Sequence, residues 1–154
     1  TLLDFERSGV DYPAQASRTL DDLVTYARAT KDLNGESLAT DPDVRRRFVE
    51  LNVEIEAARA LAYEVADMQG RGEVPNKEAS MAKLLGTQLV QNVHRFGVKL
   101  LGPYGMIRPG SDKAIMDGRM LDMTLTTIPF TIFAGTTEIQ KNIIATRGLG
   151  LPRG

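Results

Sequence analysis

The sequence contains no cysteine, no tryptophan and only one histidine, His94, among its 154 residues. The absence of cysteine excludes disulfides, thiolate metal sites and cysteine nucleophiles, and it fits a reducing compartment. The residue three before His94 is Gln91, so the Glu-x-x-His pattern of metal-binding helical bundles is missing. No nucleophile elbow accompanies His94 as a base for serine-hydrolase chemistry. We therefore expect no metal site, and we interpret His94 as a structural or solvated histidine.

The chain also lacks an excess of either charge and any long apolar run. Its 19 basic and 20 acidic residues give a formal net charge of -1, which provides no global field to attract nucleic acid or an anionic membrane. No apolar stretch approaches the length of a membrane span, and no signal peptide precedes the first residues. We therefore expect neither nucleic acid nor a membrane as a partner.

The composition suits one folded domain. With 42% hydrophobic and 25% charged residues, the chain is long enough for one well-buried domain and too short for two ordinary ones. Its first residue is a threonine rather than an initiator methionine. We expect residues 1–154 to form a single domain that was either processed or belongs to a longer polypeptide.

The clearest helical signal begins at Asp41. From there to Gly70, apolar residues recur at alternating spacings of four and three, which predicts one long helix with a single buried face. This face comprises Val44, Phe48, Leu51, Ile55, Ala58, Ala62 and Val65. Asp41 is a good N-cap, Pro42 suits the first helical position, and Gly70 with Gly72 ends the pattern. We interpret the three arginines of "VRRRF" as the solvated face of this helix.

Two further helices and a loop are predicted around it. An earlier helix follows Pro13 and is marked by Leu20, Leu23, Val24 and Ala27. A second long helix covers about residues 76–101, with a buried face of Leu85, Leu89, Val93, Phe96 and Leu100. Residues 102–111 are rich in glycine and proline, which predicts a loop.

The C-terminal part is helical by the same criteria. A helix is predicted over about residues 112–127 and is ended or kinked by Pro129. The last helix is predicted from Thr137, which has the spacing of a capping box with Gln140, to about Gly148. Amphipathic helices with short connections favour an all-α fold, here an antiparallel up-and-down bundle of four main helices plus short terminal helices.

The stretch "FAGTTEIQKNIIATRGLGLPR" resembles the C-terminal signature of the acyl-CoA dehydrogenase family, in which an aromatic-Glu-Gly-Thr turn leads into "EIQ" and a final helix. The blocks "LLDFER", "YARATKDLNG", "AKLLGTQL" and "VKLLGPYGM" agree in the same order, so the resemblance covers essentially the whole chain. It implies the C-terminal all-α domain of an FAD-dependent oxidoreductase of lipid metabolism. The complete chain would add an N-terminal helical domain and a middle β-domain, and this fragment alone would not turn over.

The family chemistry needs a base that removes the α-proton of an acyl-CoA thioester while a hydride passes from the β-carbon to the flavin. In much of the family this carboxylate directly precedes the Gly-Thr of the turn, but Ala134 occupies that position and cannot accept a proton. Other members, the isovaleryl and long-chain types among them, place the base on the first helix, directly before an arginine. The resemblance therefore implies Glu6 as the catalytic base, with Arg7 and Gly135 contacting substrate; a surface Glu-Arg ion pair is the alternative.

The resemblance also implies which residues contact the flavin. Thr136 and Glu138 match the turn that meets the cofactor, and a helix start with free N–H groups suits phosphate or ribose oxygens. Lys99, Gly102 and Gly105 match the dinucleotide-contacting block. Helix capping alone is the alternative for the turn residues.

Three departures from the family pattern leave a second interpretation open. Pro103 replaces a glycine and removes an N–H donor, Ala134 replaces the base, and Thr30 replaces the arginine that reaches the pyrophosphate across a subunit boundary. The alternative function is thus a catalytically silent structural subunit that assembles with an active acyl-CoA dehydrogenase partner.

The resemblance implies partners and a location as well. We expect an acyl-CoA substrate, an electron-transferring flavoprotein as electron acceptor, and a homo-oligomer or hetero-oligomer. The expected location is the cytoplasm of a bacterium, or a matrix-type compartment in a eukaryote.

Overall fold

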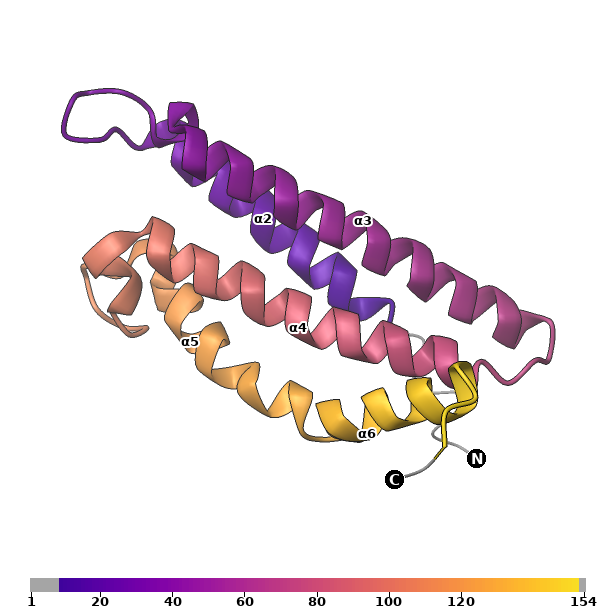
Figure 1. Cartoon of the computed structure of the whole chain (residues 1–154). Helices are drawn as coiled ribbons and strands as arrows, with labels where there is room; N and C mark the ends of the chain where they lie inside the picture. Colours follow the sequence, from indigo (N-terminus) through magenta and orange to yellow (C-terminus); the bar gives the residue numbers. More distant parts are fainter. Residues whose placement is uncertain (1–8, 153–154) are drawn as a thin grey trace.

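The computed structural model describes residues 9–152 and arranges them as a bundle of antiparallel helices (Figure 1). The helices are α2 (Asp11–Ala29), α3 (Pro42–Gly70), α4 (Asn76–Leu100), α5 (Arg119–Thr126) and α6 (Thr137–Ile143). Short 3-10 or π turns link or extend them: Leu38–Thr40, Gly102–Met106, Ile115–Gly118, Ile128–Thr131 and Ile144–Gly148. Within residues 9–152 the only β-type pairing is an isolated bridge between Lys31 and Ser37. The predicted all-α class is confirmed.

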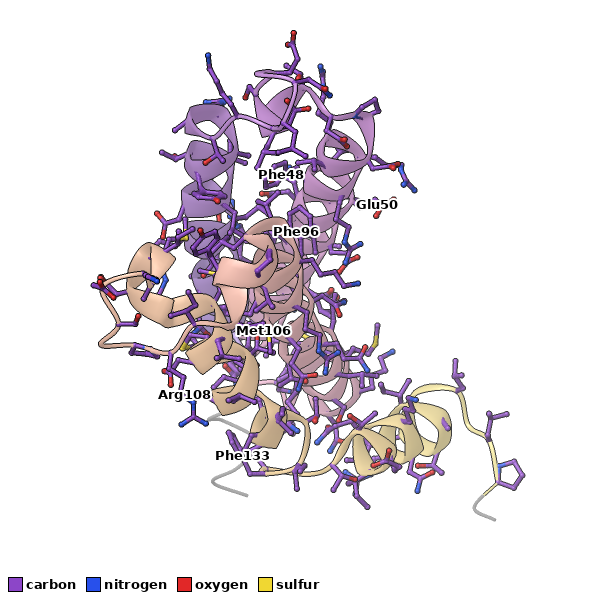
Figure 2. All side chains as sticks on the ribbon, turned by 90° about the vertical axis from the view of Figure 1, so that its left-hand side faces the viewer. Phe48, Glu50, Phe96, Met106, Arg108 and Phe133 are labelled. Atoms are coloured by element: carbon purple, nitrogen blue, oxygen red, sulfur yellow. The ribbon has the colours of Figure 1, made fainter. Side chains whose placement is uncertain are left out.

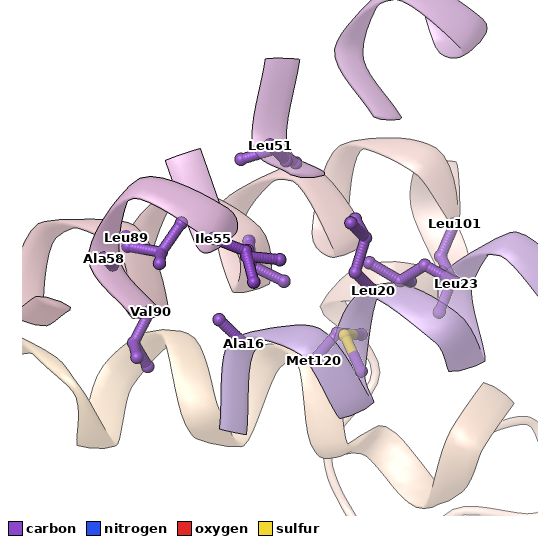
Figure 3. Close-up of a cluster of buried hydrophobic side chains, with 11 residues drawn as sticks. Ala16, Leu20, Leu23, Leu51, Ile55, Ala58, Leu89, Val90, Leu101 and Met120 are labelled. Atoms are coloured by element: carbon purple, nitrogen blue, oxygen red, sulfur yellow. The ribbon is translucent and has the colours of Figure 1, made fainter. Parts of the chain in front are cut away.

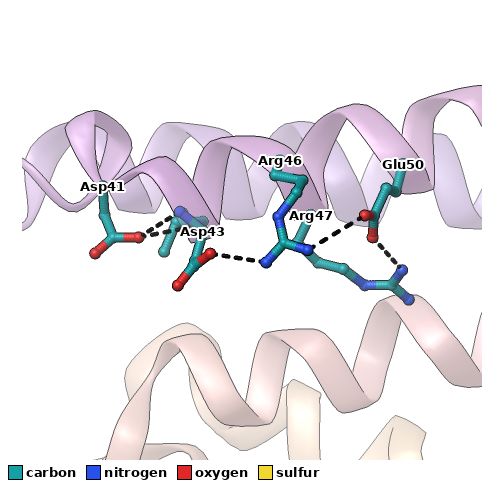
Figure 4. Close-up of polar contacts among 6 residues, drawn as sticks. Asp41, Asp43, Arg46, Arg47 and Glu50 are labelled. Carbon is teal, nitrogen blue, oxygen red and sulfur yellow. Dashed lines mark hydrogen bonds and ion pairs between the residues drawn. The ribbon is translucent and has the colours of Figure 1, made fainter.

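α3 begins where its sequence signals placed it. Asp41 is the N-cap, and its side-chain oxygen accepts hydrogen bonds from the backbone N–H groups of Asp43 at 2.8 Å and Val44 at 3.0 Å (Figure 4). On the exposed face, Arg46 pairs with Asp43 at 2.7 Å and Arg47 pairs with Glu50 at 2.9 Å. The arginines of "VRRRF" therefore lie on the solvated face of α3, as predicted, and Arg46 and Arg47 are ion-paired there.

The core lies between α2, α3 and α4, and α5 adds Met120 to it (Figure 3). Its buried members are Ala16, Leu20, Leu23, Leu51, Ile55, Ala58, Leu89, Val90, Val93, Leu101 and Met120. The predicted stripe of α3 is buried from Leu51 to Val65, each of its residues being no more than 2% exposed, while Val44 and Phe48 are half-buried. Burial of this apolar area is the main term that stabilises the bundle.

α4 is the central helix, because it packs against α2 and α3 on one side and against α5 and α6 on the other (Figure 1). The single buried face predicted for it is only partly correct. Leu89 and Val93 are fully buried, but Leu85, Phe96 and Leu100 are half-buried. Polar side chains are buried on this helix as well: Ser80, Lys83, Thr87, Gln91 and His94.

The predicted helix over residues 112–127 starts too early. Met116 (φ 51°), Asp117 (φ 56°) and Gly118 (φ 72°) adopt left-handed backbone conformations, so α5 starts only at Arg119. Right-handed helix cannot pass through such residues. The helix does end before Pro129, as expected.

Two smaller boundaries also differ from prediction. The loop predicted over residues 102–111 contains the 3-10 turn Gly102–Met106. The N-cap of α6 is Thr136 rather than Thr137, because the Thr136 hydroxyl oxygen accepts the N–H of Ile139 at 3.3 Å. α6 then passes into a π turn that ends at Gly148.

Candidate functional site

The turn before α6 is the most specifically built part of the candidate site. Ala134 has φ 54° and Gly135 has φ 99°, so two successive residues are left-handed before Thr136 returns to an extended conformation. The φ of Gly135 strains any residue other than glycine, and an added Cβ would lie 2.4 Å from the side-chain nitrogen of Gln140, which would have to move. The side chain of Ala134 is exposed.

Two buried polar side chains hold the carbonyl groups of this turn. The Lys83 ammonium of α4 donates a hydrogen bond to the Gly135 carbonyl oxygen. The Gln140 amide of α6 donates to the carbonyl oxygens of Ala134 at 3.2 Å and Gly135 at 3.3 Å. Neither contact was predicted from the sequence, where Lys83 appears only within the block "AKLLGTQL" and Gln140 only as part of a capping box. A lysine inside an otherwise buried helix is the signal that could have identified the contact.

Thr136 and Glu138 lie on the outer side of the same turn. Glu138 is exposed, and its own backbone N–H lowers the pKa of its carboxyl, with smaller contributions from the Thr136 hydroxyl and the charge of Lys141. This carboxylate is therefore ionised and tied to the helix start. The geometry fits the capping alternative and leaves both side chains on a surface that a ligand can reach.

Apolar side chains border this turn. Tyr12 of α2, Phe130 and Phe133 form a chain of aromatic contacts, with ring centroids 6.1 Å and 5.5 Å apart (Figure 2 labels Phe133). Phe133 itself is 50% exposed. The side chains of Ile128, Ile132 and Ile139 are exposed to a similar extent. Exposed apolar groups gathered in one place are typical of a surface that binds a ligand or another protein segment.

The predicted base and one predicted substrate contact, Glu6 and Arg7, lie outside the described residues. The described chain starts next to the turn region, because a Cβ added at Gly9 would lie 3.6 Å from the Cβ of Ala82 on α4. Ala82 directly precedes Lys83, which bonds to Gly135. The segment entering α2 and the turn before α6 therefore lie against neighbouring residues of α4.

The second group of predicted cofactor residues lies at the other end of α4. Lys99 and Gly102 are exposed, and nothing lies within 4 Å of a Cβ added at Gly102. Gly105 is buried, and an added Cβ would lie 2.3 Å from the carbonyl oxygen of Val98. Gly105 is thus required for packing the 3-10 turn onto α4. Because an α-helix rises about 1.5 Å per residue, Lys99 lies roughly 24 Å from Lys83 along the axis of α4.

Two of the surfaces described above suit parts of a flavin dinucleotide, and the loop at Thr30 does not. The open surface at Gly102, with the Lys99 ammonium beside it in sequence, suits an anionic or polar group. The outer face of Ala134–Thr136, bordered by aromatic side chains, suits a flat apolar ring that needs a few polar contacts. Where the family has a phosphate-binding arginine, the loop at Thr30 has instead the Asp32 carboxylate, which accepts the N–H groups of Asn34 at 2.8 Å and Glu36 at 2.9 Å.

His94 is structural, as interpreted. It is 1% exposed, and its Nδ1 lies 2.7 Å from the Val90 carbonyl oxygen, which assigns the ring proton to Nδ1. Burial lowers the pKa of His94, so the ring is neutral. Across residues 9–152 no cluster of three or more potential metal ligands occurs, and none of the helices described there is long and apolar enough to cross a membrane.

Comparisons with known proteins agree with this geometry. Residues 1–149 match the family model described as acyl-CoA dehydrogenase, C-terminal domain. The chain is 30% identical to acyl-CoA dehydrogenase FadE26 of Mycobacterium tuberculosis, over 98% of this chain and 38% of the relative. It is 34% identical to acyl-CoA dehydrogenase IpdE1 of the same organism, over 98% of this chain and 37% of the relative.

Solved structures give the same result. The Tcur3481-Tcur3483 steroid ACAD is similar with a TM-score of 0.87 and 29% identity, over 100% of this chain and 39% of the other. The ChsE4-ChsE5 complex of Mycobacterium tuberculosis is similar with a TM-score of 0.85 and 31% identity, over 92% of this chain and 36% of the other. The chain therefore spans little more than a third of the length of the proteins that it matches.

Proposed function

The chain belongs to the acyl-CoA dehydrogenase family, as its C-terminal helical domain, and we propose that the complete protein oxidises an acyl-CoA thioester between its α and β carbons with FAD. The observation that carries this proposal is the turn Ala134–Thr136, which is held from inside by Lys83 and Gln140 while its outer face stays accessible. A rigid turn beside exposed aromatic side chains can position a planar ring and an acyl chain against each other.

FAD would supply the hydride acceptor when bound. In this chain, Thr136 and Glu138 would contact it at one end of α4, and Lys99 with Gly102 would contact it at the other. Because Lys83, which holds the turn, and Lys99 lie roughly 24 Å apart along α4, the two groups would serve distant parts of one extended dinucleotide or two cofactors in an oligomer. Gly105 would belong to the same cofactor-contacting group, and its lack of a side chain also lets the 3-10 turn pack onto α4.

Glu6 is the proposed base, and Arg7 and Gly135 are the proposed substrate contacts. Support for Glu6 comes from two observations. The Ala134 methyl cannot take a proton, and Gly9, three residues after Glu6, lies beside the part of α4 that holds the turn. A carboxylate enclosed there would have its pKa raised by burial and could remove the α-proton.

We further propose an acyl-CoA with a bulky ring-bearing acyl group as substrate, an electron-transferring flavoprotein as acceptor and a cytoplasmic oligomer as the working form. The similarity to the Tcur3481-Tcur3483 steroid ACAD supports the ring-bearing group, and the similarity to the ChsE4-ChsE5 complex supports assembly of two chains. A panel of straight-chain and polycyclic acyl-CoA esters would test the substrate class.

The exposed Ala134 favours a second candidate, a catalytically silent subunit of a hetero-oligomer. The two functions differ in where flavin and activity lie. The complete protein would be expressed alone and then with the products of neighbouring genes, and bound flavin and its bleaching by acyl-CoA would be measured. Flavin that is bound and bleached by the protein alone supports the enzyme. Flavin that binds only with a partner, and bleaching that survives Glu6→Gln, supports the silent subunit and rejects the enzyme.

A further inference from the structure

Lys83 is buried in the middle of the bundle, with 4% of its surface exposed. Lysine is almost never buried to this extent unless its ammonium is paired, because removing the charge from water is costly. Here the ammonium donates to the carbonyl oxygen of Gly135, 52 residues further along the chain. The contact therefore links the central helix α4 to the turn before α6.

Gln140 reaches the same turn from the other side. It is 0% exposed, and its amide nitrogen donates to the carbonyls of Ala134 at 3.2 Å and Gly135 at 3.3 Å. Its Oε1 atom is buried and accepts no hydrogen bond within the described part of the chain. An apolar side chain of similar size would supply no donor to these two carbonyl oxygens. The two donated bonds thus explain why an amide occupies this position.

The backbone that these two side chains hold is strained. Ala134 is a left-handed non-glycine residue with φ 54°, a conformation that costs energy and persists only where the surroundings fix it. The Gly135 carbonyl has two lone pairs, and it accepts one donor from α4 and one from α6. With both carbonyl oxygens directed toward the interior, the Ala134 methyl is exposed and the Thr136 side chain is half-exposed.

We propose that Lys83 is a positioning residue for the flavin-contacting turn. Together with Gln140 it fixes the carbonyls of Ala134 and Gly135 in the interior, and it thereby holds residues 134–136 in the one conformation that presents their outer face to the cofactor. This inference rests on the proposed function for its ligand, but the ordering of the turn by Lys83 is independent of it. The ammonium suits the task because a charged donor forms a stronger hydrogen bond with a carbonyl than a neutral one does.

The first test is Lys83→Met in the complete protein, which retains length and apolar stem and removes the donor. Lys77→Met is the matched control, because Lys77 is an exposed lysine of the same helix whose partner is Glu78. Amide hydrogen exchange at residues 134–137 of the apoprotein and the dissociation constant of FAD would be measured. Lys83→Met should accelerate exchange at the turn and weaken FAD binding, each by about tenfold or more, with unchanged helix content. Lys77→Met should change neither quantity.

Lys83→Ala gives a second test that separates the ammonium from its packing. The truncated side chain leaves space for a small amine, so propylammonium should restore FAD affinity in a saturable way, whereas propanol should not. If Lys83→Met does not fold, Gln140→Leu replaces it, because loss of the second donor should produce the same exchange and binding defects.

The outcomes separate this inference from the proposed function. The positioning role would be rejected if folded Lys83→Met, or Gln140→Leu where it is needed, showed wild-type exchange rates at the turn and wild-type FAD affinity. That result would leave the proposed flavoenzyme function standing. A wild-type protein that binds no FAD with or without partners would reject the proposed function. Hydrogen exchange would then still decide whether Lys83 orders the turn.

Discussion

Phe48 of α3 and Phe96 of α4 meet edge to face, with ring centroids 5.2 Å apart and ring planes at 90° (Figure 2). Both rings are half-buried and pack against the core cluster. This arrangement brings the positive edge of one ring to the negative face of the other.

The aromatic pair predicts a measurable coupling. Replacing Phe48 and Phe96 by leucine, singly and together, should reveal a favourable interaction of about 0.5–1.5 kcal/mol beyond the loss of buried area. Urea denaturation of the four proteins measures it. Strictly additive single-mutant effects would show that the ring geometry contributes nothing.

Ile55→Asp should destabilise the domain by about 3 kcal/mol or more, because it places an unpaired charge in the core. Ile55 of α3 is 1% exposed and belongs to the buried cluster that α3 shares with α2 and α4 (Figure 3). Val53→Asp is the matched control on the same helix, since Val53 is 62% exposed. Thermal melts of both variants check the prediction, and equal melting temperatures would contradict the burial of this face.

His94 should make stability depend on pH in the acidic range. Burial lowers the pKa of His94, the hydrogen bond to Val90 opposes this, and the charge of Arg119 lowers the pKa further. Asp11 and Arg18 of α2 line the same hollow. Because the unfolded chain binds the proton more readily, the stabilisation is complete above the ordinary histidine pKa of about 6.5 and is lost as pH falls toward the lower folded-state value.

The measurement is the free energy of unfolding of wild type and His94→Leu between neutral pH and pH 5. The wild type should lose up to about 1.4 kcal/mol per pH unit from this one group below pH 6.5, in addition to any loss that other groups cause. His94→Leu should lose only the latter part. Parallel curves for the two proteins would show that His94 is not the group responsible.

Glu6→Gln in the complete protein should abolish most α-proton abstraction and leave flavin bound, because the amide retains the shape of the carboxylate and loses its basicity. Exchange of the α-proton and flavin bleaching by acyl-CoA measure the effect. Ala134→Glu in the Glu6→Gln background should restore part of the activity. The Ala134 side chain is exposed on the outer face of the turn, so a longer side chain can be accommodated there. Full activity of Glu6→Gln alone would reject the base assignment.

The sequence predictions are more accurate for a helix that packs against others on one side than for a helix that is enclosed on two sides. α3 was predicted correctly because one of its faces is buried, so its apolar stripe and its Asp41 cap are both visible in the sequence. α4 is enclosed on two sides, and it buries Lys83, Gln91 and His94, which a polar-out pattern assigns to the surface. The late start of α5 was missed because Met116 and Asp117 are left-handed although neither is a glycine.

The candidate site was predictable only through the family resemblance. That resemblance identified the turn and the missing carboxylate at Ala134, and Gly135 has a physical requirement for glycine in the structure. The role of Lys83 depends on a contact across 52 residues, which no local pattern contains. Gly105 stays a predicted cofactor contact, and the structure adds a packing reason for its lack of a side chain, because the Val98 carbonyl oxygen lies close to it.

The short connection between α3 and α4 has a consequence for the order of events during folding. Only residues 71–75 separate these two long antiparallel helices (Figure 1), which share the buried apolar cluster. Closing so short a loop costs little chain entropy, whereas α5 and α6 reach α4 only through longer and partly left-handed segments. We therefore expect the α3–α4 hairpin to form in the transition state for folding. Ile55→Val should then mainly slow folding, and Met120→Ala should mainly accelerate unfolding.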